Sequence, residues 1–165
     1  MGRGFEELLL PHLDAAYNLA RFLLRDRTAA DDVVQEAFLR AFRSFAGYRG
    51  GDAKAWLLAI VRNCCFSWSG AHRGYAAEST AELAELPDCE ESTPESLAAR
   101  TDEIHAIRRL IERLPEPFRE TVVLRELEDL SYKEIAAVTG VAIGTVMSRL
   151  ARGRRLLTRE LERVP

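Results

Sequence analysis

The chain has 165 residues, of which 47% are apolar and 30% are charged, and its formal net charge is −3. This composition excludes a wholly disordered chain and predicts one domain or two small ones. No apolar run reaches the roughly 18 residues of a membrane span. Glu6, Glu7 and Pro11 are not the residues of a signal peptide. Three cysteines without a CxxC pair predict neither a disulfide framework nor a zinc site. We therefore expect a cytoplasmic protein without metal or cofactor.

Charge is distributed unevenly along the chain. Residues 71–100 hold seven acidic residues against two basic ones, with two prolines and many small residues. Such a segment is typical of a flexible linker. Residues 40–73 and 141–159 are instead rich in arginine and lysine, although either run alone could be a solvated helix face. The pattern predicts domains at 5–70 and 101–163, with no fixed mutual orientation in the absence of a partner.

Apolar residues recur at helical spacing throughout, which predicts an all-α fold of two small helical domains. Pro11 is expected in the first turn of the first helix and Asp52 at the N-cap of the third. Cys64 falls on an apolar stripe as a small buried side chain, whereas Cys65 points elsewhere. A further helix is expected at 117–127. The stripes are Leu13, Tyr17, Ala20 and Leu24; Val34, Phe38, Ala41 and Phe45; Leu57, Ile60 or Val61, Cys64 and Trp68; and Ile104, Ile107, Ile111 and Leu114.

The strongest local pattern is a helix-turn-helix at residues 131–157. Ser131 and Glu134 form a capping box, Gly140 suits a turn with positive φ, and Val146 is placed to pack between the helices. The second helix should begin near 143–145. Its apolar side is predicted to be Ile143, Val146, Leu150 and Leu157. Its other side carries hydroxyls early and arginines later, which favours DNA binding over an ordinary helical hairpin with a basic face.

Two segments give the chain a resemblance to a known family. DDVVQEAFLRAFRSFAGYRG at 31–50, followed by AWLLAIVRN, is one, and 113–157 with the helix-turn-helix is the other. The chain resembles the extracytoplasmic-function (ECF) group of bacterial RNA polymerase sigma factors. The resemblance implies a non-enzymatic transcription initiation factor that binds core polymerase through its largest subunits, recognises two promoter elements and is controlled by an anti-sigma factor.

The same resemblance implies roles for particular residues. Those expected to bind core polymerase are Asp31, Asp32, Val34, Gln35, Glu36 and Phe38, whose acids also suit the helix dipole. Those expected at the melted minus-ten DNA are Tyr48, Arg49, Lys54, Arg62 and Asn63. Those expected at the minus-thirty-five DNA are Thr145, Ser148, Arg149, Arg152, Arg154 and Arg155. Met147 replaces a basic residue of many relatives, which puts hydrogen-bonded readout there in doubt. The linker is either a polymerase-channel segment or a plain spacer.

Three other functions remain to be weighed. A sigma-like decoy that sequesters an anti-sigma factor would tend to lose the arginine face that this chain retains. A polymerase-independent repressor would leave the N-terminal domain unexplained, and it usually needs a dimer. An enzyme would have to use Cys64, Cys65 and His72, for which the sequence shows no orienting carboxylate.

Overall fold

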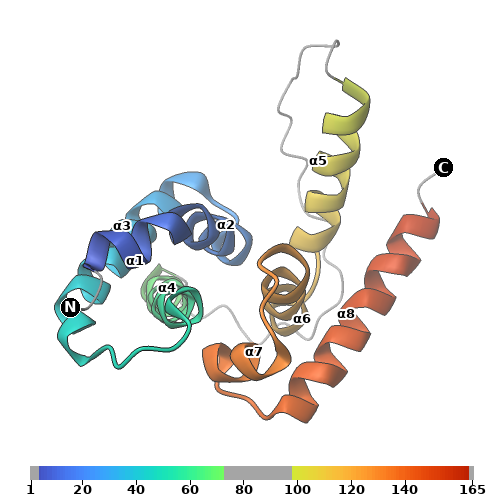
Figure 1. Cartoon of the computed structure of the whole chain (residues 1–165). Helices are drawn as coiled ribbons and strands as arrows, with labels where there is room; N and C mark the ends of the chain where they lie inside the picture. The colour runs from blue at the N-terminus through green and yellow to red at the C-terminus, as the bar shows by residue number, and fades with distance from the viewer. Residues whose placement is uncertain (1–3, 73–97, 164–165) are drawn as a thin grey trace.

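The computed structural model describes residues 4–72 and 98–163, and within these ranges the chain is helical without strands (Figure 1). This confirms the predicted all-α class. The predicted linker falls mostly on residues 73–97, which include Cys89 and lie outside the described residues. The two ends of the predicted linker, 71–72 and 98–100, are helical. The N-terminal half comprises α1 (Phe5–Leu9), η1 (Leu10–His12), α2 (Leu13–Leu24), α3 (Arg27–Ser44), η2 (Phe45–Gly47) and α4 (Ala53–His72). The C-terminal half comprises α5 (Ala98–Glu112), α6 (Glu116–Val122), the π-helical segment η3 (Val123–Leu127), α7 (Tyr132–Thr139) and α8 (Ile143–Arg163).

Local capping residues set the helix starts in the N-terminal half. The Asp26 carboxylate accepts hydrogen bonds from the N–H groups of Thr28 and Ala29 at 2.9 and 3.2 Å and so begins α3. Asp52 accepts from the N–H of Ala55 at 3.1 Å, which confirms it as the cap of α4. Pro11 differs from the prediction: it lies in η1, one short turn before α2, where a residue without an N–H is tolerated.

Helix α4 is the centre of the molecule, and it corrects the prediction for Cys65. It packs against α2 and α3 on one side and α7 on another, so more than one stripe of its surface is buried. Cys64 and Cys65 are 3% and 2% exposed. Burial raises the pKa of Cys64, and burial together with the neighbouring thiol raises the pKa of Cys65 to about 12.

Both buried thiols should therefore resist alkylation. At neutral pH the folded protein is expected to leave Cys64 and Cys65 unmodified by iodoacetamide, because the reactive thiolate is scarce and enclosed. The same reagent should modify both in urea. Peptide mass mapping of the two samples checks this, and equal labelling of folded and unfolded protein would contradict the buried placement.

The helix-turn-helix forms as predicted in the C-terminal half. Ser131 Oγ accepts the N–H of Glu134 at 3.1 Å and donates to its carboxylate at 3.0 Å, so α7 starts at a satisfied cap. Gly140 ends α7 with φ +73°, α8 begins at Ile143, and Val146 is buried at 1% exposure. Gly153, further along α8, lies against Val122 of α6.

Four apolar residues predicted to face the core are exposed instead. Leu13, at the start of α2, is 41% exposed. Ile104 and Ile107 of α5 are 55% and 48% exposed, because only Ile111 near the end of α5 and Leu114 just after it meet the core. Ile143 at the start of α8 is 46% exposed, since α8 buries the stripe of Val146, Leu150 and Gly153. Apolar spacing marks a face without showing that a partner covers it.

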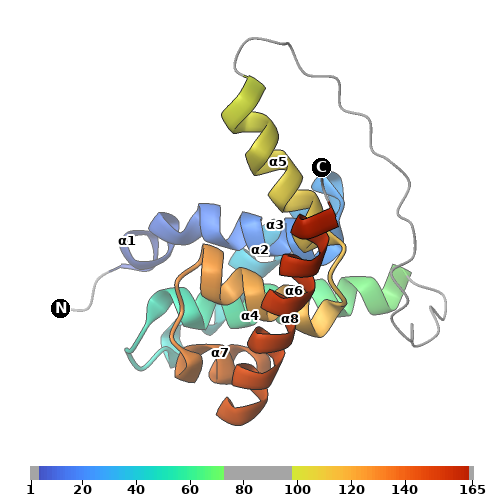
Figure 2. The same cartoon turned by 90° about the vertical axis from the view of Figure 1, so that its right-hand side faces the viewer.

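The two halves pack against each other, contrary to the expectation of no fixed orientation. Helix α4 lies beside α7, and α2 lies beside α6, while α5 and the end of α8 extend away from the N-terminal half (Figures 1 and 2). Buried side chains of both halves form one hydrophobic cluster. This contact fixes what surrounds the predicted site residues.

Within the described residues no single helix is long and apolar enough to cross a membrane. The bent pair of α7 and α8 reaches the required length and apolarity only when the two helices are taken together.

Candidate protein and nucleic-acid interfaces

One long face of α3 is available to a protein partner. Of the predicted polymerase-binding residues, Asp31, Asp32 and Gln35 are exposed, and Glu36 is half-buried with its carboxylate 3.0 Å from Arg40. Phe38 is half-buried, with its ring edge-on to Phe5 at 6.5 Å. Val34 differs from the prediction. It is 3% exposed and belongs to the chain's own core, because it shares a stripe with buried alanines of α3.

The same face continues through two residues that sequence reasoning missed. Leu39 and Phe42 are 52% and 66% exposed, and they follow Asp32 and Gln35 at helical spacing. Large apolar side chains beside acids are typical of a protein interface. The sequence held a partial signal, since Phe42 lies off the predicted Phe38–Phe45 stripe. We call Asp32, Gln35, Leu39 and Phe42 the α3 face.

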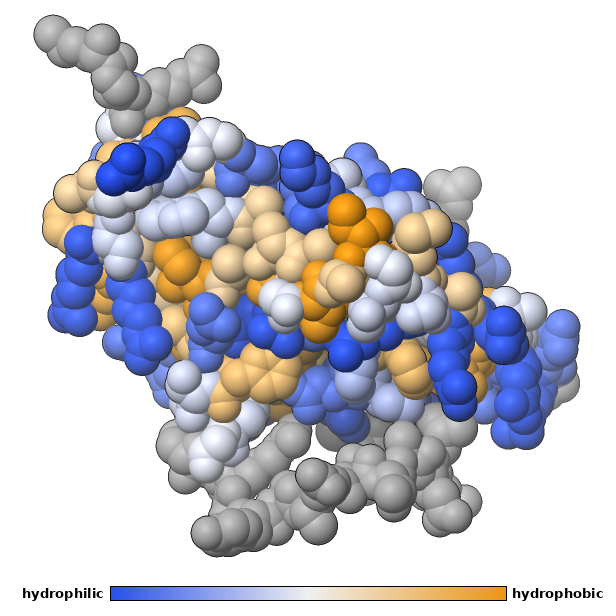
Figure 3. All heavy atoms as spheres, turned by 90° about the horizontal axis from the view of Figure 1, so that it is seen from below, coloured by the Kyte–Doolittle hydropathy of each residue, from blue (hydrophilic) through white to orange (hydrophobic). Residues whose placement is uncertain are grey.

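The exposed face of α8 carries the cations expected at DNA. Arg152 and Arg155 are exposed, and the Arg152 guanidinium lies 5.7 Å from the Phe118 ring. Arg149 and Thr145 are half-buried, and the Ser148 hydroxyl donates to the Thr145 carbonyl at 3.0 Å. On the side of the molecule that holds α7 and the start of α8, apolar side chains gather among charged ones (Figure 3).

Among the α8 arginines that were predicted to contact DNA, Arg154 has an acidic partner. Its Nε donates to Glu126 at 2.7 Å, and this hydrogen bond raises the pKa of the guanidinium. The pair is exposed on both sides, so it is worth little and would yield to a phosphate. Its charge is nevertheless neutralised in this structure.

The predicted minus-ten residues fall into separate environments. Arg49 and Asn63 are exposed. Tyr48 is half-buried: its ring stacks on Phe45 at 5.8 Å and tilts against Trp56 at 5.1 Å, while its hydroxyl donates to the Gly51 carbonyl at 2.8 Å. The loop thus holds Tyr48 in a packed aromatic group rather than leaving the ring free.

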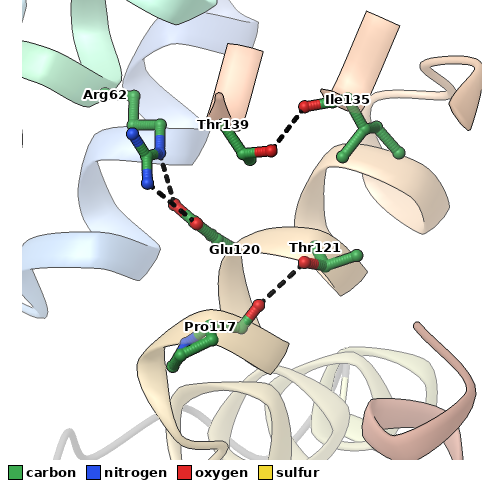
Figure 4. A network of polar contacts seen from close by, with 6 residues as sticks. All are labelled: Arg62, Pro117, Glu120, Thr121, Ile135 and Thr139. Carbon is green, nitrogen blue, oxygen red and sulfur yellow. Dashed lines mark hydrogen bonds and ion pairs between the residues drawn. The ribbon is translucent and has the colours of Figure 1, made fainter. Parts of the chain in front are cut away.

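The two remaining minus-ten cations are held by acids of the C-terminal half. Arg62 of α4 makes two hydrogen bonds to the Glu120 carboxylate of α6, at 2.7 and 3.1 Å (Figure 4). The Glu120 side chain is 3% exposed, so this pair is largely removed from water. A two-pronged contact of this kind is among the stronger ion pairs in proteins.

Lys54 of α4 is also held by an acidic residue of the C-terminal half, Glu128. Its Nζ donates to the Glu128 carbonyl at 2.7 Å and lies 3.3 Å from the carboxylate, whose other oxygen accepts from Asn18 at 3.0 Å. We call the Arg62–Glu120 and Lys54–Glu128 pairs the interdomain ion pairs. Glu120 and Glu128 therefore pair both of the cations that were predicted to contact the minus-ten DNA.

Sequence reasoning missed these two acids. Glu120 stands two residues before the apolar run Val122–Leu124, and an acid so close to a buried run needs a partner. The partner itself is 58 positions away, and Lys54 is 74 positions from Glu128. No local pattern links residues at that separation.

A helix-turn-helix with a cationic second helix, joined to a helical domain with an exposed acidic and apolar face, is typical of a two-domain DNA-binding protein. Residues 8–73 match the family model Sigma-70 region 2, and residues 104–157 match Sigma-70, region 4. The RNA polymerase sigma-H factor of Pseudomonas aeruginosa is 36% identical over 97% of this chain and 87% of its own length. The ECF RNA polymerase sigma-E factor of Escherichia coli is 35% identical over 79% and 73%. The chain belongs to the ECF group of RNA polymerase sigma factors, which confirms the resemblance seen in its sequence.

One further relative is longer than this chain, and two solved structures share its fold. The ECF sigma factor SigE of Mycolicibacterium smegmatis is 35% identical over 93% of this chain, which spans 60% of that protein. The fold also resembles the sigma factor RpoE of Bartonella quintana, solved with the anti-sigma factor NepR, with a TM-score of 0.72, 27% identity and 98% coverage of both chains. CnrH, solved with the cytosolic domain of CnrY, shares the fold at a TM-score of 0.69 and 24% identity. Sigma factors are transcription initiation factors, so an enzymatic role is set aside.

Proposed function

We propose that this protein binds core RNA polymerase through the α3 face and directs it to promoters, with α4 at the minus-ten element and α8 at the minus-thirty-five element. The observation that carries the proposal is the helix-turn-helix, whose second helix exposes Arg152 and Arg155. A cationic recognition helix supplies phosphate and base contacts. A repressor built on that motif would have no use for the exposed acids and phenylalanine of α3.

The interdomain ion pairs place a condition on this function. Lys54 and Arg62 can contact a DNA strand only after Glu128 and Glu120 release them. We infer that core polymerase binds an open form in which the two halves separate, so that each reaches its own promoter element. Joining the two weak contacts through one chain raises the local concentration of the second.

We infer two further features of the protein's setting. The work of a promoter-specificity factor lies in the cytoplasm, with the polymerase. An anti-sigma factor is the expected regulator, because the Bartonella quintana RpoE of similar fold was solved with one. Recovery of a one-to-one complex with a protein that blocks polymerase binding would support this regulation, and constant availability of the free factor would oppose it.

The function is tested by transcription from fragmented host DNA. The purified protein and core polymerase are incubated with the fragments, and the 5′ ends of the transcripts are mapped. We expect discrete starts that share an upstream motif. The Arg152→Ala variant should weaken use of that motif and lower the salt dependence of DNA binding by about one unit of slope. The control is Arg163→Ala, at the far end of α8, where Glu160 already pairs the guanidinium at 3.3 Å.

Charge reversal on the α3 face tests polymerase binding separately. The Asp32→Arg variant is expected to bind core polymerase at least about tenfold more weakly, since a cation replaces an acid that faces the partner. Asp14→Arg makes the same charge change on an exposed acid of α2 and should bind normally. Affinity is measured by fluorescence anisotropy of the labelled factor. Absence of both polymerase binding and transcript starts in the unmodified protein would favour the decoy instead.

A further inference from the structure

The recognition helix begins with an exposed apolar pair. Ile143 and Met147 are 46% and 52% exposed, and a spacing of four residues stacks them on one face of α8. Between them, Gly144 has nothing within 4 Å of the position where a Cβ would stand. The first turn of α8 therefore presents a small apolar surface with open space around it.

The polar side chains near the start of α8 are less available for a contact with a base edge than the apolar pair is. The Ser148 hydroxyl donates its proton to the Thr145 carbonyl, and Thr145 is half-buried. The first cation of α8, Arg149, is also half-buried, and the exposed Arg152 and Arg155 follow one and two turns later. Exposed apolar side chains thus lie at the start of α8 and exposed cations further along it, with Arg155 nearer than Arg152 to the Met147 side of the helix.

This order of apolar and cationic residues matches the base edges of a DNA major groove and the phosphates that flank it. In a helix-turn-helix the N-terminal residues of the second helix approach the base edges, while later cations meet phosphates. The one apolar group that a base pair presents in the major groove is the thymine C5-methyl. An arginine at position 147 would favour the O6 and N7 atoms of guanine instead.

We propose that Met147 and Ile143 are specificity-determining residues that read thymine C5-methyl groups in the upstream promoter element. This inference rests on the proposed function of α8 as the reader of that element. Charge complementarity supports DNA as the occupant, because the exposed Arg155 lies about 80° around α8 from the exposed Met147, two turns further along the helix. The factor accordingly prefers thymine over cytosine at the position that Met147 contacts.

Replacing thymine with uracil tests the inference, because this removes the methyl group alone. Holoenzyme made from the full chain and core polymerase is titrated onto duplexes carrying the mapped upstream element, with one deoxythymidine at a time replaced by deoxyuridine. We expect about fourfold weaker binding at one or two positions, the effect of losing one buried methyl. Met147→Ala should abolish the difference at one of them, and Met147→Arg should shift the preference there toward guanine.

Controls separate this inference from the proposed function. Leu161→Ala removes an equally exposed apolar side chain, 52%, from the other end of α8 and should leave the thymine preference intact. Equal binding of thymine and uracil at every position, with Arg152→Ala still weakening the element, overturns the methyl reading and leaves the function standing. Loss of all upstream sequence preference, with Arg152→Ala without effect, overturns both.

Discussion

Replacing Arg62 with methionine is expected to open the molecule. The substitution leaves the Glu120 carboxylate without its cation in a place where the side chain is 3% exposed. Removing one partner of a buried ion pair costs about 3–5 kcal/mol. Methionine retains an apolar stem beside Phe66, whose ring lies 4.5 Å from the guanidinium. The strain is relieved by separating the halves, so that Glu120 regains water, and the open form should gain at least about a hundredfold in relative population.

Small-angle scattering measures this opening directly. The radius of gyration of Arg62→Met should exceed that of the unmodified protein. A double variant tests whether the unpaired Glu120 charge causes the expansion. Adding Glu120→Leu to Arg62→Met removes the stranded charge and should restore the compact form, because apolar replacement of a whole buried pair is often neutral or favourable. Arg40→Met breaks the exposed pair with Glu36 and should change nothing. Identical dimensions for Arg62→Met and the unmodified protein would show that the pair does not hold the halves together.

Replacing Gly153 with valine should destabilise the C-terminal half. A Cβ at this position would lie 2.7 Å from Val122 Cγ2 and 3.5 Å from Phe118 Cβ, so α8 and α6 must move apart. Overpacking of this kind costs about 1–3 kcal/mol, and the valine's two additional methyl groups place the expected value at the upper end. The thermal midpoint should fall by about 6–10 °C for a chain of this size.

The same helix provides a matched control for this substitution. Gly144 has open space around its Cβ position, so Gly144→Val should leave the thermal midpoint within about 2 °C of the original. Both variants are followed by circular dichroism during heating. An unchanged midpoint for Gly153→Val would contradict the close approach of α6 and α8.

Structural features that depend on a short stretch of sequence were predicted correctly. The Ser131 cap, the Gly140 turn and the packed Val146 all lie within a span of 16 residues, and each depends on local backbone geometry or on one neighbouring helix. Asp52 belongs to the same group. Steric and hydrogen-bonding rules for such segments do not depend on the rest of the fold.

The failures have a common physical origin in contacts between distant segments. Cys65 is buried because α4 is enclosed by helices from both halves, which a single apolar stripe does not reveal. Ile107 has the spacing of a core residue but lies where α5 leaves the body of the protein. The pairing of Lys54 and Arg62 depends on acids from the other half. For the candidate interfaces, sequence thus identified residue types and segments, while accessibility depended on tertiary packing.

In the proposed mechanism, the interdomain ion pairs also raise the concentration of factor that is needed to bind DNA or polymerase. A ligand that binds only the open form has its apparent dissociation constant multiplied by the inverse of the open fraction. If one molecule in a hundred is open, DNA and polymerase each meet a factor that behaves as though it were a hundredfold more dilute. Once one of them has captured the open form, the other no longer bears that penalty. Helix α4 thereby links the two binding events as positive cooperativity, without requiring any contact between polymerase and promoter.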